Sequence, residues 1–265
     1  RGARREAAMS DTASVAGAWA WRLSSAACTD KGPVRSANED SHFRDDTLGL
    51  YLVADGLGGH AAGEVASTLA VDAFAGFVSR SQADEDLTWP YGQDPKLTLD
   101  ENRLLTAAKL AHRRVNSAAS ADQDKLAGMG TTLVAALVHK TRITFCHAGD
   151  SRLYLLEDGV AGLTRLTKDD IITIDDARRP RTALTNAIGI GQFGSVHLGR
   201  HDARAEFTLM LCSDGLHGVV DDQRLYEIVR GSDIDRVAHD LVKAALDAGT
   251  RDNVTAVVAR LGGLP

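Results

Sequence analysis

Three short apolar segments follow one another closely in the middle of the chain, and their spacing restricts the fold. They run from Leu133 to Val138, from Arg142 to His147 and from Arg152 to Glu157. A parallel crossover needs about a dozen residues or more, so strands this close together are expected to pair antiparallel. The dipeptide Asp158-Gly159 predicts a two-residue hairpin turn after the third segment. The short spacing between these segments therefore excludes a doubly wound parallel sheet for the middle of the chain.

The remaining pattern predicts a mixture of strands and helices. Alternating or continuous apolar runs predict strands over residues 19–28, 48–54, 206–213 and 254–259. Apolar residues at helical spacing predict helices over 61–78, from the capping box at 98–101, from Asp221 or Asp222, and from Ser232 to a stop at Gly249. No linker, repeat or low-complexity tract divides the 265 residues, so we expect a single domain over 19–265. Residues 1–18 are interpreted as an N-terminal extension or a cloning remnant.

Composition restricts the partners and the compartment. The chain is 44% hydrophobic and 25% charged, as expected for a globular protein, and its formal net charge of −6 argues against nucleic-acid or anionic-membrane partners. No apolar run approaches the ~20 residues that span a bilayer. Cys28, Cys146 and Cys212 form no CxxC pair and are interpreted as free thiols in a reducing compartment. We therefore expect a cytoplasmic protein, and a monomer.

Four aspartates lie at the ends of predicted strands. Asp55, Asp150 and Asp214 follow apolar strands directly or closely, and Asp252 precedes one. For one such residue alone, a turn is the ordinary explanation. In a compact sheet, however, these ends would gather at one edge, where four carboxylates repel unless a cation neutralises them. Oxygen ligands without paired His or Cys favour Mg²⁺ or Mn²⁺ over zinc. A shared metal site is therefore the better hypothesis.

Two charged segments have more than one interpretation. In residues 29–40, Arg35 could offer its planar fork to a phosphate while Glu39 and Asp40 face a metal or its waters. A solvated loop explains such a run equally simply, and spacing alone favours the loop. The charged stretch from Leu163 to Gly194 is consistent with a mobile surface segment beside a site, or with a plain solvated loop.

Six short motifs occur in an order typical of one enzyme family. They are Arg35-x-x-Asn38-Glu39-Asp40, Val53-Ala54-Asp55-Gly56-Leu57-Gly58-Gly59-His60, Gly128-x-Gly130-Thr131-Thr132, Gly149-Asp150-Ser151-Arg152, Ser213-Asp214-Gly215-Leu216 and Arg251-Asp252-Asn253-Val254-Thr255. Each is weak alone, but six in the right order are highly specific. From about Cys28 to Arg260 the chain resembles the metal-dependent protein phosphatases of type 2C, in their bacterial branch.

The resemblance implies a fold and an activity. The fold would be an α+β, four-layer α-β-β-α sandwich with two central antiparallel sheets. The activity would be hydrolysis of phosphoserine and phosphothreonine by a water that two Mn²⁺ or Mg²⁺ ions activate. The substrates would be phosphorylated proteins, and the enzyme would oppose a Ser/Thr kinase pathway in a bacterium.

The resemblance also assigns roles to single residues. Arg35 would bind the substrate phosphate. The metal ligands would be Asp55, which would bridge both ions, the Gly56 carbonyl, Asp214 and Asp252. Glu39 and Asp40 would bind metal-coordinated waters or support the ligands. Asp150 would bind a weaker third ion.

The chain also departs from the family pattern. Leu57 replaces a histidine that animal members place after the bridging Asp-Gly, so His60 is a candidate general acid or substrate contact, with a metal-bound water as the alternative acid. Gly218 replaces a second acid at the third metal, which should weaken that ion. Asp169-Asp170 stands where Asp-His is usual, and the flap around 168–184 is shorter than typical, which should alter substrate choice or flap dynamics.

Two other functions need to be weighed against this one. A non-catalytic relative could bind phosphoproteins as a regulatory module, but the intact Asp55, Asp214 and Asp252 argue against lost catalysis. A metal-dependent hydrolase of small phosphoesters would share the same ligands and differ only in its substrates.

Overall fold

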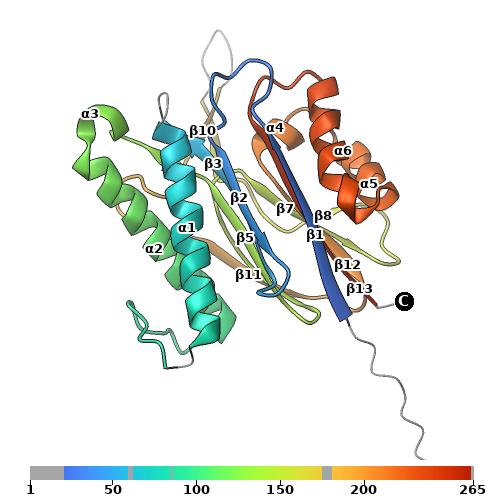
Figure 1. Ribbon diagram of the computed structural model, residues 1–265, viewed down its shortest axis with the longest axis horizontal. Coiled ribbons are helices and arrows are strands. Elements are labelled where there is room, and N and C mark those ends of the chain that lie inside the picture. Colours follow the sequence, from blue (N-terminus) through green and yellow to red (C-terminus); the bar gives the residue numbers. More distant parts are fainter. Residues whose placement is uncertain (1–20, 59–61, 85, 175–180, 264–265) are drawn as a thin grey trace, which may run out of the picture.

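Two antiparallel sheets packed face to face form the centre of the molecule, with helices on both outer sides (Figure 1). This computed structural model describes residues 21–58, 62–84, 86–174 and 181–263. The four-layer α-β-β-α sandwich that the resemblance implies is confirmed.

The first sheet has the strand order β11-β6-β5-β3-β2, and the short β4 pairs with β3. Its strands are β11 (His197–Asp202), β6 (Arg142–Ala148), β5 (Leu133–His139), β3 (Leu50–Leu57), β2 (Asp40–Asp45) and β4 (Gly130–Thr131). Helices α1 (Ala62–Ala83) and α2 (Leu99–Ala121) cover its outer face, and α3 (Gln123–Leu126) follows α2 (Figure 1). The capping box predicted at Thr98 and Glu101 is present at the start of α2.

The second sheet has the order β1-β13-β12-β7-β8. Its strands are β1 (Trp21–Asp30), β13 (Val254–Gly263), β12 (Phe207–Cys212), β7 (Arg152–Glu157) and β8 (Thr164–Arg165). Its outer face is covered by α4 (Asp214–His217), α5 (Asp222–Gly231) and α6 (Ile234–Asp247). The start predicted at Asp221 or Asp222 is confirmed: α5 begins at Asp222, and the Asp221 side chain caps it by accepting a hydrogen bond from the Arg224 amide.

The central strands are apolar throughout because each of their faces is buried. Side chains alternate across a strand, so Leu50 and Leu52 of β3 pack toward α1 and α2, whereas Tyr51 and Val53 pack between the sheets. On β12, Leu209 and Leu211 face the other sheet, while Met210 and Cys212 pack against α4, α5 and α6. The continuous runs in the sequence therefore reflect a sandwich interior covered on both outer sides.

One predicted pairing is wrong, and the turn predicted at Asp158-Gly159 is present, with the Val160 amide donating to the Glu157 carbonyl at 3.2 Å, but does not close a two-residue hairpin. Strands β6 and β7 follow one another closely but belong to different sheets, because Gly149-Asp150-Ser151 carries the chain across the sandwich. Gly149 has φ +99°, a backbone conformation that redirects the chain and that L side chains rarely adopt. The hairpin after β7 is longer than two residues, since β8 begins only at Thr164. Spacing excludes a parallel crossover, but it does not show that the chain stays in one sheet.

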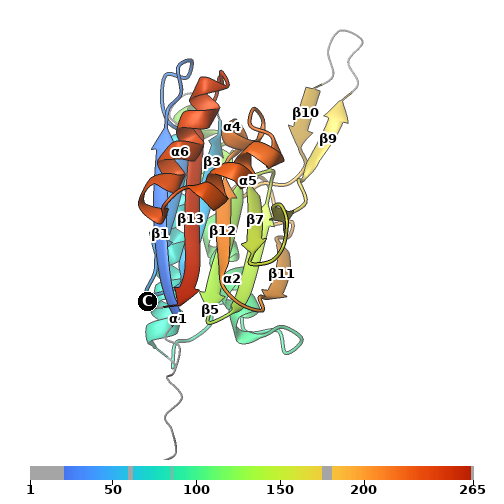
Figure 2. The ribbon, with the colours of Figure 1, turned by 90° about the vertical axis from the view of Figure 1, so that its right-hand side faces the viewer.

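A separate two-stranded hairpin projects from the sandwich. Strands β9 (Ile171–Ile174) and β10 (Arg181–Leu184) pair antiparallel with each other and form a sheet of their own among the described residues. Figure 2 shows the hairpin extending beyond the body at the end where α4 lies. The predicted flap region thus contains a hairpin of regular structure, and its length relative to other family members stays a prediction.

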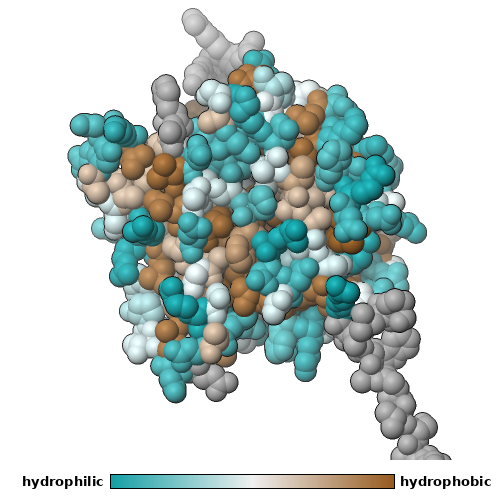
Figure 3. All heavy atoms as spheres, viewed as in Figure 1, coloured by the Kyte–Doolittle hydropathy of each residue, from teal (hydrophilic) through white to brown (hydrophobic). Residues whose placement is uncertain are grey.

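The face of the molecule seen in Figure 3 mixes polar and apolar side chains. Hydrophilic side chains cover much of the face seen in Figure 3, with hydrophobic ones in small patches between them. Within the part of the chain that the structure describes, no helix combines the length and the apolar character that crossing a membrane requires.

Truncating a side chain that is buried between the sheets should lower the stability more than truncating an exposed one. Leu209 is fully buried there, so Leu209→Ala should lower the free energy of unfolding by about 2–5 kcal/mol, measured by urea denaturation. The same change at Leu99, which is 54% exposed on α2, should cost less than about 1 kcal/mol. Equal losses at the two positions would contradict the assignment of Leu209 to the central core.

Candidate metal centre

Acidic residues from both sheets meet in one pocket at the sandwich edge that lies below the β9–β10 hairpin. The cavity has a volume of about 320 Å³. Its polar lining contains the predicted site residues Arg35, Glu39, Asp55, Gly56, Asp150, Asp214 and Asp252. Ile171, Thr182, Ala183 and Leu184 of the hairpin line its other wall. Residues up to 217 positions apart in the sequence thus come together, as expected for acids at strand ends.

Backbone hydrogen bonds hold Asp55 in place at the end of β3. Its amide donates to Thr132 Oγ1 at 2.9 Å, and its carbonyl accepts from the Thr132 amide at 2.8 Å and from Thr131 Oγ1 at 2.9 Å. The Gly-x-Gly-Thr-Thr motif therefore serves to position this carboxylate. The next residue must be glycine, because a Cβ on Gly56 would collide with the carbonyls of Gly63 and Glu39.

Asp40 lies directly beneath the pocket. It is the register partner of Asp55 on the neighbouring strand β2, and it is 7% exposed and does not line the cavity. Ser213 Oγ donates to Asp40 Oδ2 at 2.8 Å, a bond that joins the two sheets. The other oxygen, Oδ1, is buried and has no hydrogen-bond partner among the residues that the structure describes, and the same is true of Asp214 Oδ1. Ionised carboxylates only accept, so these two orphan oxygens call for a cation or a proton.

Asn253 holds the loop that carries Arg35 and Glu39. Its Oδ1 accepts from the Glu39 amide at 2.8 Å, and its Nδ2 donates to the carbonyls of Lys31 at 2.8 Å and Ala37 at 2.9 Å. Asn253 belongs to one of the six motifs, but the sequence alone assigned it no role. Its position beside Asp252 was the only available signal, because its partners lie more than 200 residues away.

Crowding and burial raise the pKa values of these carboxyls. Burial raises the pKa of Asp55 well above its ordinary value, and the charges of Asp40, Asp214, Asp252 and Asp150 raise it further. Burial likewise raises the pKa of Asp40 to about 6, an effect that hydrogen bonds from Thr255 and Ser213 oppose. Each group therefore favours a bound proton or a nearby cation.

Asp150 shows the same behaviour at the turn between the sheets. Burial and the nearby Asp214 raise its pKa to about 6. Its carbonyl is hydrogen-bonded to His217 Nε2 at 3.0 Å. Burial lowers the pKa of His217 to about 4, so its ring is neutral at physiological pH and Nε2 carries the donated proton. His217 was not singled out from the sequence, since nothing local distinguishes it.

Arg35 supplies positive charge at the mouth of the pocket. Its guanidinium forms an ion pair with Asp252 Oδ2, and the two side chains are 52% and 35% exposed. The hydrogen bond to Asp252 is the largest cause of the raised pKa of Arg35. An ion pair this exposed contributes only about 0–1 kcal/mol, so the guanidinium is available to other anions.

Comparison with known proteins agrees with this geometry. Residues 34–248 match the family profile described as Protein phosphatase 2C. The chain belongs to the protein phosphatase 2C family. The resemblance drawn from the six motifs, including the bacterial branch, is confirmed.

The relatives of this family member are bacterial. The chain is 39% identical over 248 residues to the serine/threonine protein phosphatase PstP of Mycobacterium tuberculosis, a match that covers 88% of this chain and 44% of PstP. It thus spans less than half of that relative. It is 32% identical to the Listeria monocytogenes serine/threonine phosphatase stp, over 87% of this chain and 92% of that protein. The crystal structure of the PstP catalytic domain with two manganese ions matches with a TM-score of 0.74 and 36% identity, over 92% of this chain and 100% of that one.

The donor set fits hard divalent ions. The pocket is lined by carboxylate oxygens, and two buried carboxylate oxygens have no hydrogen-bond partner within the described part of the chain. Among the described residues, no group of three or more His, Cys, Asp or Glu side chains is placed closely enough to hold a metal ion as it stands. In this structure Asp252, one of the candidate ligands, forms an ion pair with the Arg35 guanidinium. The individual ligand roles stay predictions, and His60 lies outside the described residues.

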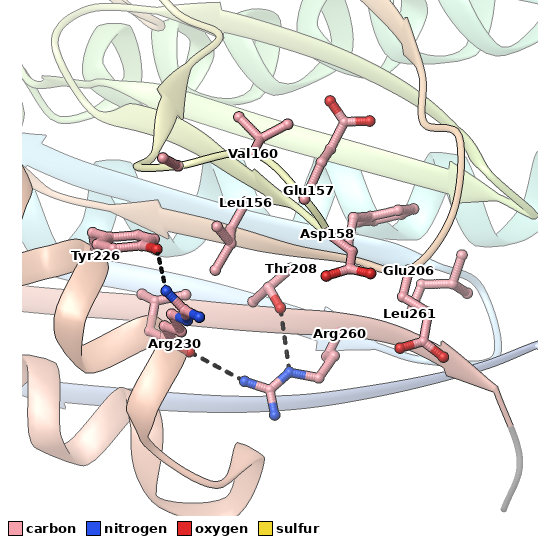
Figure 4. A pocket seen from close by; sticks show the side chains of 14 residues that line it. Leu156, Glu157, Asp158, Val160, Glu206, Thr208, Tyr226, Arg230, Arg260 and Leu261 are labelled. Atoms are coloured by element: carbon pink, nitrogen blue, oxygen red, sulfur yellow. Dashed lines mark hydrogen bonds between the residues drawn. The ribbon is translucent and has the colours of Figure 1, made fainter.

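A larger cavity, of about 470 Å³, lies at the opposite end of β12 and β13 from Asp214 and Asp252 (Figure 4). Its two arginines are already engaged: Arg260 donates to Thr208 Oγ1 at 3.2 Å and to the Val229 carbonyl at 3.2 Å, and Arg230 donates to the Tyr226 hydroxyl at 2.7 Å. Val229 lies in the last turn of α5, so Arg260 satisfies a carbonyl that the helix leaves unpaired. Both arginines therefore have a structural role, and the lining holds three acidic residues, Glu157, Asp158 and Glu206, against five in the candidate site.

The raised pKa values predict how cations and pH act together on stability. Burial raises the pKa of Asp40 and that of Asp150 to about 6 in the folded protein, from an ordinary value near 3.8, so the folded protein binds more protons between these pH values. Raising the pH through this window therefore removes stability, unless a divalent cation replaces the protons. Mn²⁺ should raise the melting temperature by roughly 5 °C or more near neutral pH, and by clearly less at about pH 5.

Differential scanning fluorimetry measures this effect, with NaCl at equal ionic strength as the control. A Mn²⁺-induced shift of equal size at both pH values, or no shift at all, would contradict a cation site formed by these carboxyls.

Proposed function

We propose that this chain is a divalent-metal-dependent protein phosphatase that hydrolyses phosphoserine and phosphothreonine. The observation that carries the proposal is the shared lining of one cavity by five carboxylate side chains and one guanidinium. A phosphate dianion would be repelled by such carboxylates alone. With bound cations the same cavity becomes a phosphate site, and Arg35 lies at its mouth.

The chain's own residues would hold the ions as the family pattern suggests. Asp55, the Gly56 carbonyl, Asp214 and Asp252 would be ligands to two ions, supported by Glu39 and Asp40, and Asp150 would serve a weaker third. When bound, the ions supply Lewis-acid activation of a water and neutralise phosphate charge. Manganese is the ion in the PstP structure, which supports Mn²⁺ or its close analogue Mg²⁺ for this chain.

Arg35 would orient the substrate. Its planar guanidinium matches two phosphate oxygens, and it can exchange the exposed Asp252 carboxylate for the phosphate at little cost. Charge that develops on the equatorial oxygens would then lie against a fixed cation. Either His60 or a water would protonate the leaving alkoxide.

The cysteines argue against a thiol-based phosphatase mechanism. A thiolate nucleophile requires a lowered pKa at an accessible position. Here Cys146 and Cys212 are fully buried, and burial raises both pKa values, that of Cys212 to about 12. Burial also raises the pKa of Cys28. None of the three lines the pocket.

The protein context follows from the relatives. PstP and stp are named as serine/threonine phosphatases of bacteria, which supports phosphorylated proteins as substrates and an opposing Ser/Thr kinase pathway as the context. A monomer stays a prediction. The hairpin beside the cavity favours a protein substrate over a small phosphoester, because it extends the wall beyond the reach of a lone phosphate group.

Loss of one acidic ligand should abolish turnover. Asp214→Asn should lower kcat/KM for a phosphothreonine peptide by about a hundredfold or more in Mn²⁺, because a neutral amide binds a hard cation poorly. Asp202→Asn is the matched control, since Asp202 is exposed and pairs with Arg142 away from the pocket. EDTA should remove the wild-type activity completely.

Phosphate release from phosphoserine, phosphothreonine and phosphotyrosine peptides measures these effects. Full activity in excess EDTA would refute the proposal. Tight phosphopeptide binding without turnover at saturating Mn²⁺ would favour the non-catalytic alternative, and faster turnover of sugar phosphates or nucleotides than of phosphopeptides would favour the small-phosphoester hydrolase.

The role of Arg35 gives a separate prediction. Arg35→Ala should raise KM for p-nitrophenyl phosphate by about tenfold or more, and Arg35→Lys should recover only part of the loss, because lysine lacks the planar fork. Arg251→Ala, which removes an exposed arginine next to Asp252 and outside the pocket lining, should change KM less than about twofold. Equal KM values for wild type and Arg35→Ala would show that Arg35 does not contact the phosphate.

A further inference from the structure

The β9–β10 hairpin is joined to the body at a narrow neck. Asp170 precedes β9 and Thr185 follows β10, and the Thr185 amide donates to the Asp170 carbonyl at 2.8 Å. The Asp170 amide in turn donates to the Gly149 carbonyl at 3.0 Å. The neck is thus attached to the turn that carries Asp150, and Figure 2 shows the hairpin extending outward from there.

The Asp170 carboxylate makes three more contacts at this neck. Oδ2 accepts from the Gly149 amide at 3.1 Å and from Asn186 Nδ2 at 3.0 Å, and Oδ1 lies 2.8 Å from His197 Nε2. The side chain is 12% exposed. One carboxylate therefore connects the turn beside Asp150, the segment that follows β10 and the first sheet.

The neighbouring Asp169 shows that this arrangement is specific. Asp169 binds both Nε and a terminal nitrogen of Arg152 at 3.0 and 2.7 Å, which anchors the segment to β7. That pair involves neither the hairpin nor the turn at Gly149. Of these two aspartates, Asp170 is the one that contacts both the turn at Gly149 and the segment that follows β10.

His197 connects the neck to a rigid element. It lies on β11 opposite His147 of β6, and the two rings stack with 4.7 Å between centroids and 22° between planes. His147 is buried, so the stack fixes the plane of the more exposed His197 ring. Its Nε2 is thereby directed at Asp170.

We propose that Asp170, held by His197, is a positioning residue that fixes the hairpin wall relative to Asp150, so that a phosphopeptide lying along the hairpin presents its phosphate to the acidic pocket. This inference rests on the proposed phosphatase function. A peptide contacts the wall formed by Ile171, Thr182 and Leu184, whereas a small aryl phosphate needs only the acidic end of the cavity. Loosening the neck should therefore weaken peptide substrates selectively.

The first test is amide hydrogen exchange in the metal-free protein, followed by NMR. Asp170→Ala removes the acceptor of the Gly149 amide and should speed its exchange by about tenfold or more, while His197→Ala should speed exchange at Gly149 and Thr185 by at least about threefold. His201→Ala is the matched control: it removes an imidazole from the same strand, where Nε2 lies 3.1 Å from Glu157 Oε2. Unchanged exchange in His197→Ala, or equal changes in His201→Ala, would overturn the proposal.

The second test is a comparison of substrates in Mn²⁺. His197→Ala should raise KM for a phosphothreonine peptide by about fivefold, with kcat and the KM for p-nitrophenyl phosphate changed less than about twofold, and His201→Ala should change neither KM. An equal rise in KM for both substrates would indicate general damage and would overturn the positioning role. If the wild type turned over neither substrate, the proposed function would fail, and the exchange data would still decide whether Asp170 fixes the hairpin.

Discussion

Repulsion among the buried carboxylates at one edge of the sandwich is the constraint on which the rest of the site depends. Asp55 lies within the influence of Asp40, Asp214, Asp252 and Asp150, and each of these charges raises its pKa. Such a group would move apart if its backbone were free. Instead, the Asp55 carbonyl and amide are bound by the threonine pair 131–132, so relaxation would break strand pairing as well. The large apolar core offsets the unfavourable electrostatic energy of this edge.

The site exists only where the two sheets meet. Asp40 and Asp55 come from the first sheet, and Asp214 and Asp252 flank strands of the second. Two polar links join these halves: Ser213 Oγ to Asp40, and the Glu39 amide to Asn253. The turn at Gly149 crosses from one sheet to the other and brings Asp150 to the same place. A shift of one sheet against the other would therefore separate the acids before it exposed much of the core.

Sequence reasoning was sufficient for features with a local pattern and insufficient for features that arise from long-range contacts. Strands that end in Asp-Gly, the capping box at Thr98 and the order of the six motifs were enough to predict the sandwich and the grouping of the acids. The sheet membership of residues 152–157 was not predictable, because spacing is the same whether a short turn stays in a sheet or leaves it. The roles of Asn253, Asp170 and His217 were also missed. Their side-chain partners lie between 16 and 222 residues away, and no periodicity records such contacts.

The ion pair between Arg35 and Asp252 shows why protein charge alone does not complete this site. Arg35 neutralises the outermost carboxylate, yet the pKa values of Asp40 and Asp55 stay raised with the guanidinium in place. Burial and the charges of the neighbouring carboxylates raise these pKa values, and one guanidinium that lies half exposed at the cavity mouth does not offset them. The positive charge that Asp40, Asp55 and Asp214 require must therefore come from inside the cavity. A small dication surrounded by oxygen donors meets that requirement, and it leaves Arg35 free to bind an anionic substrate.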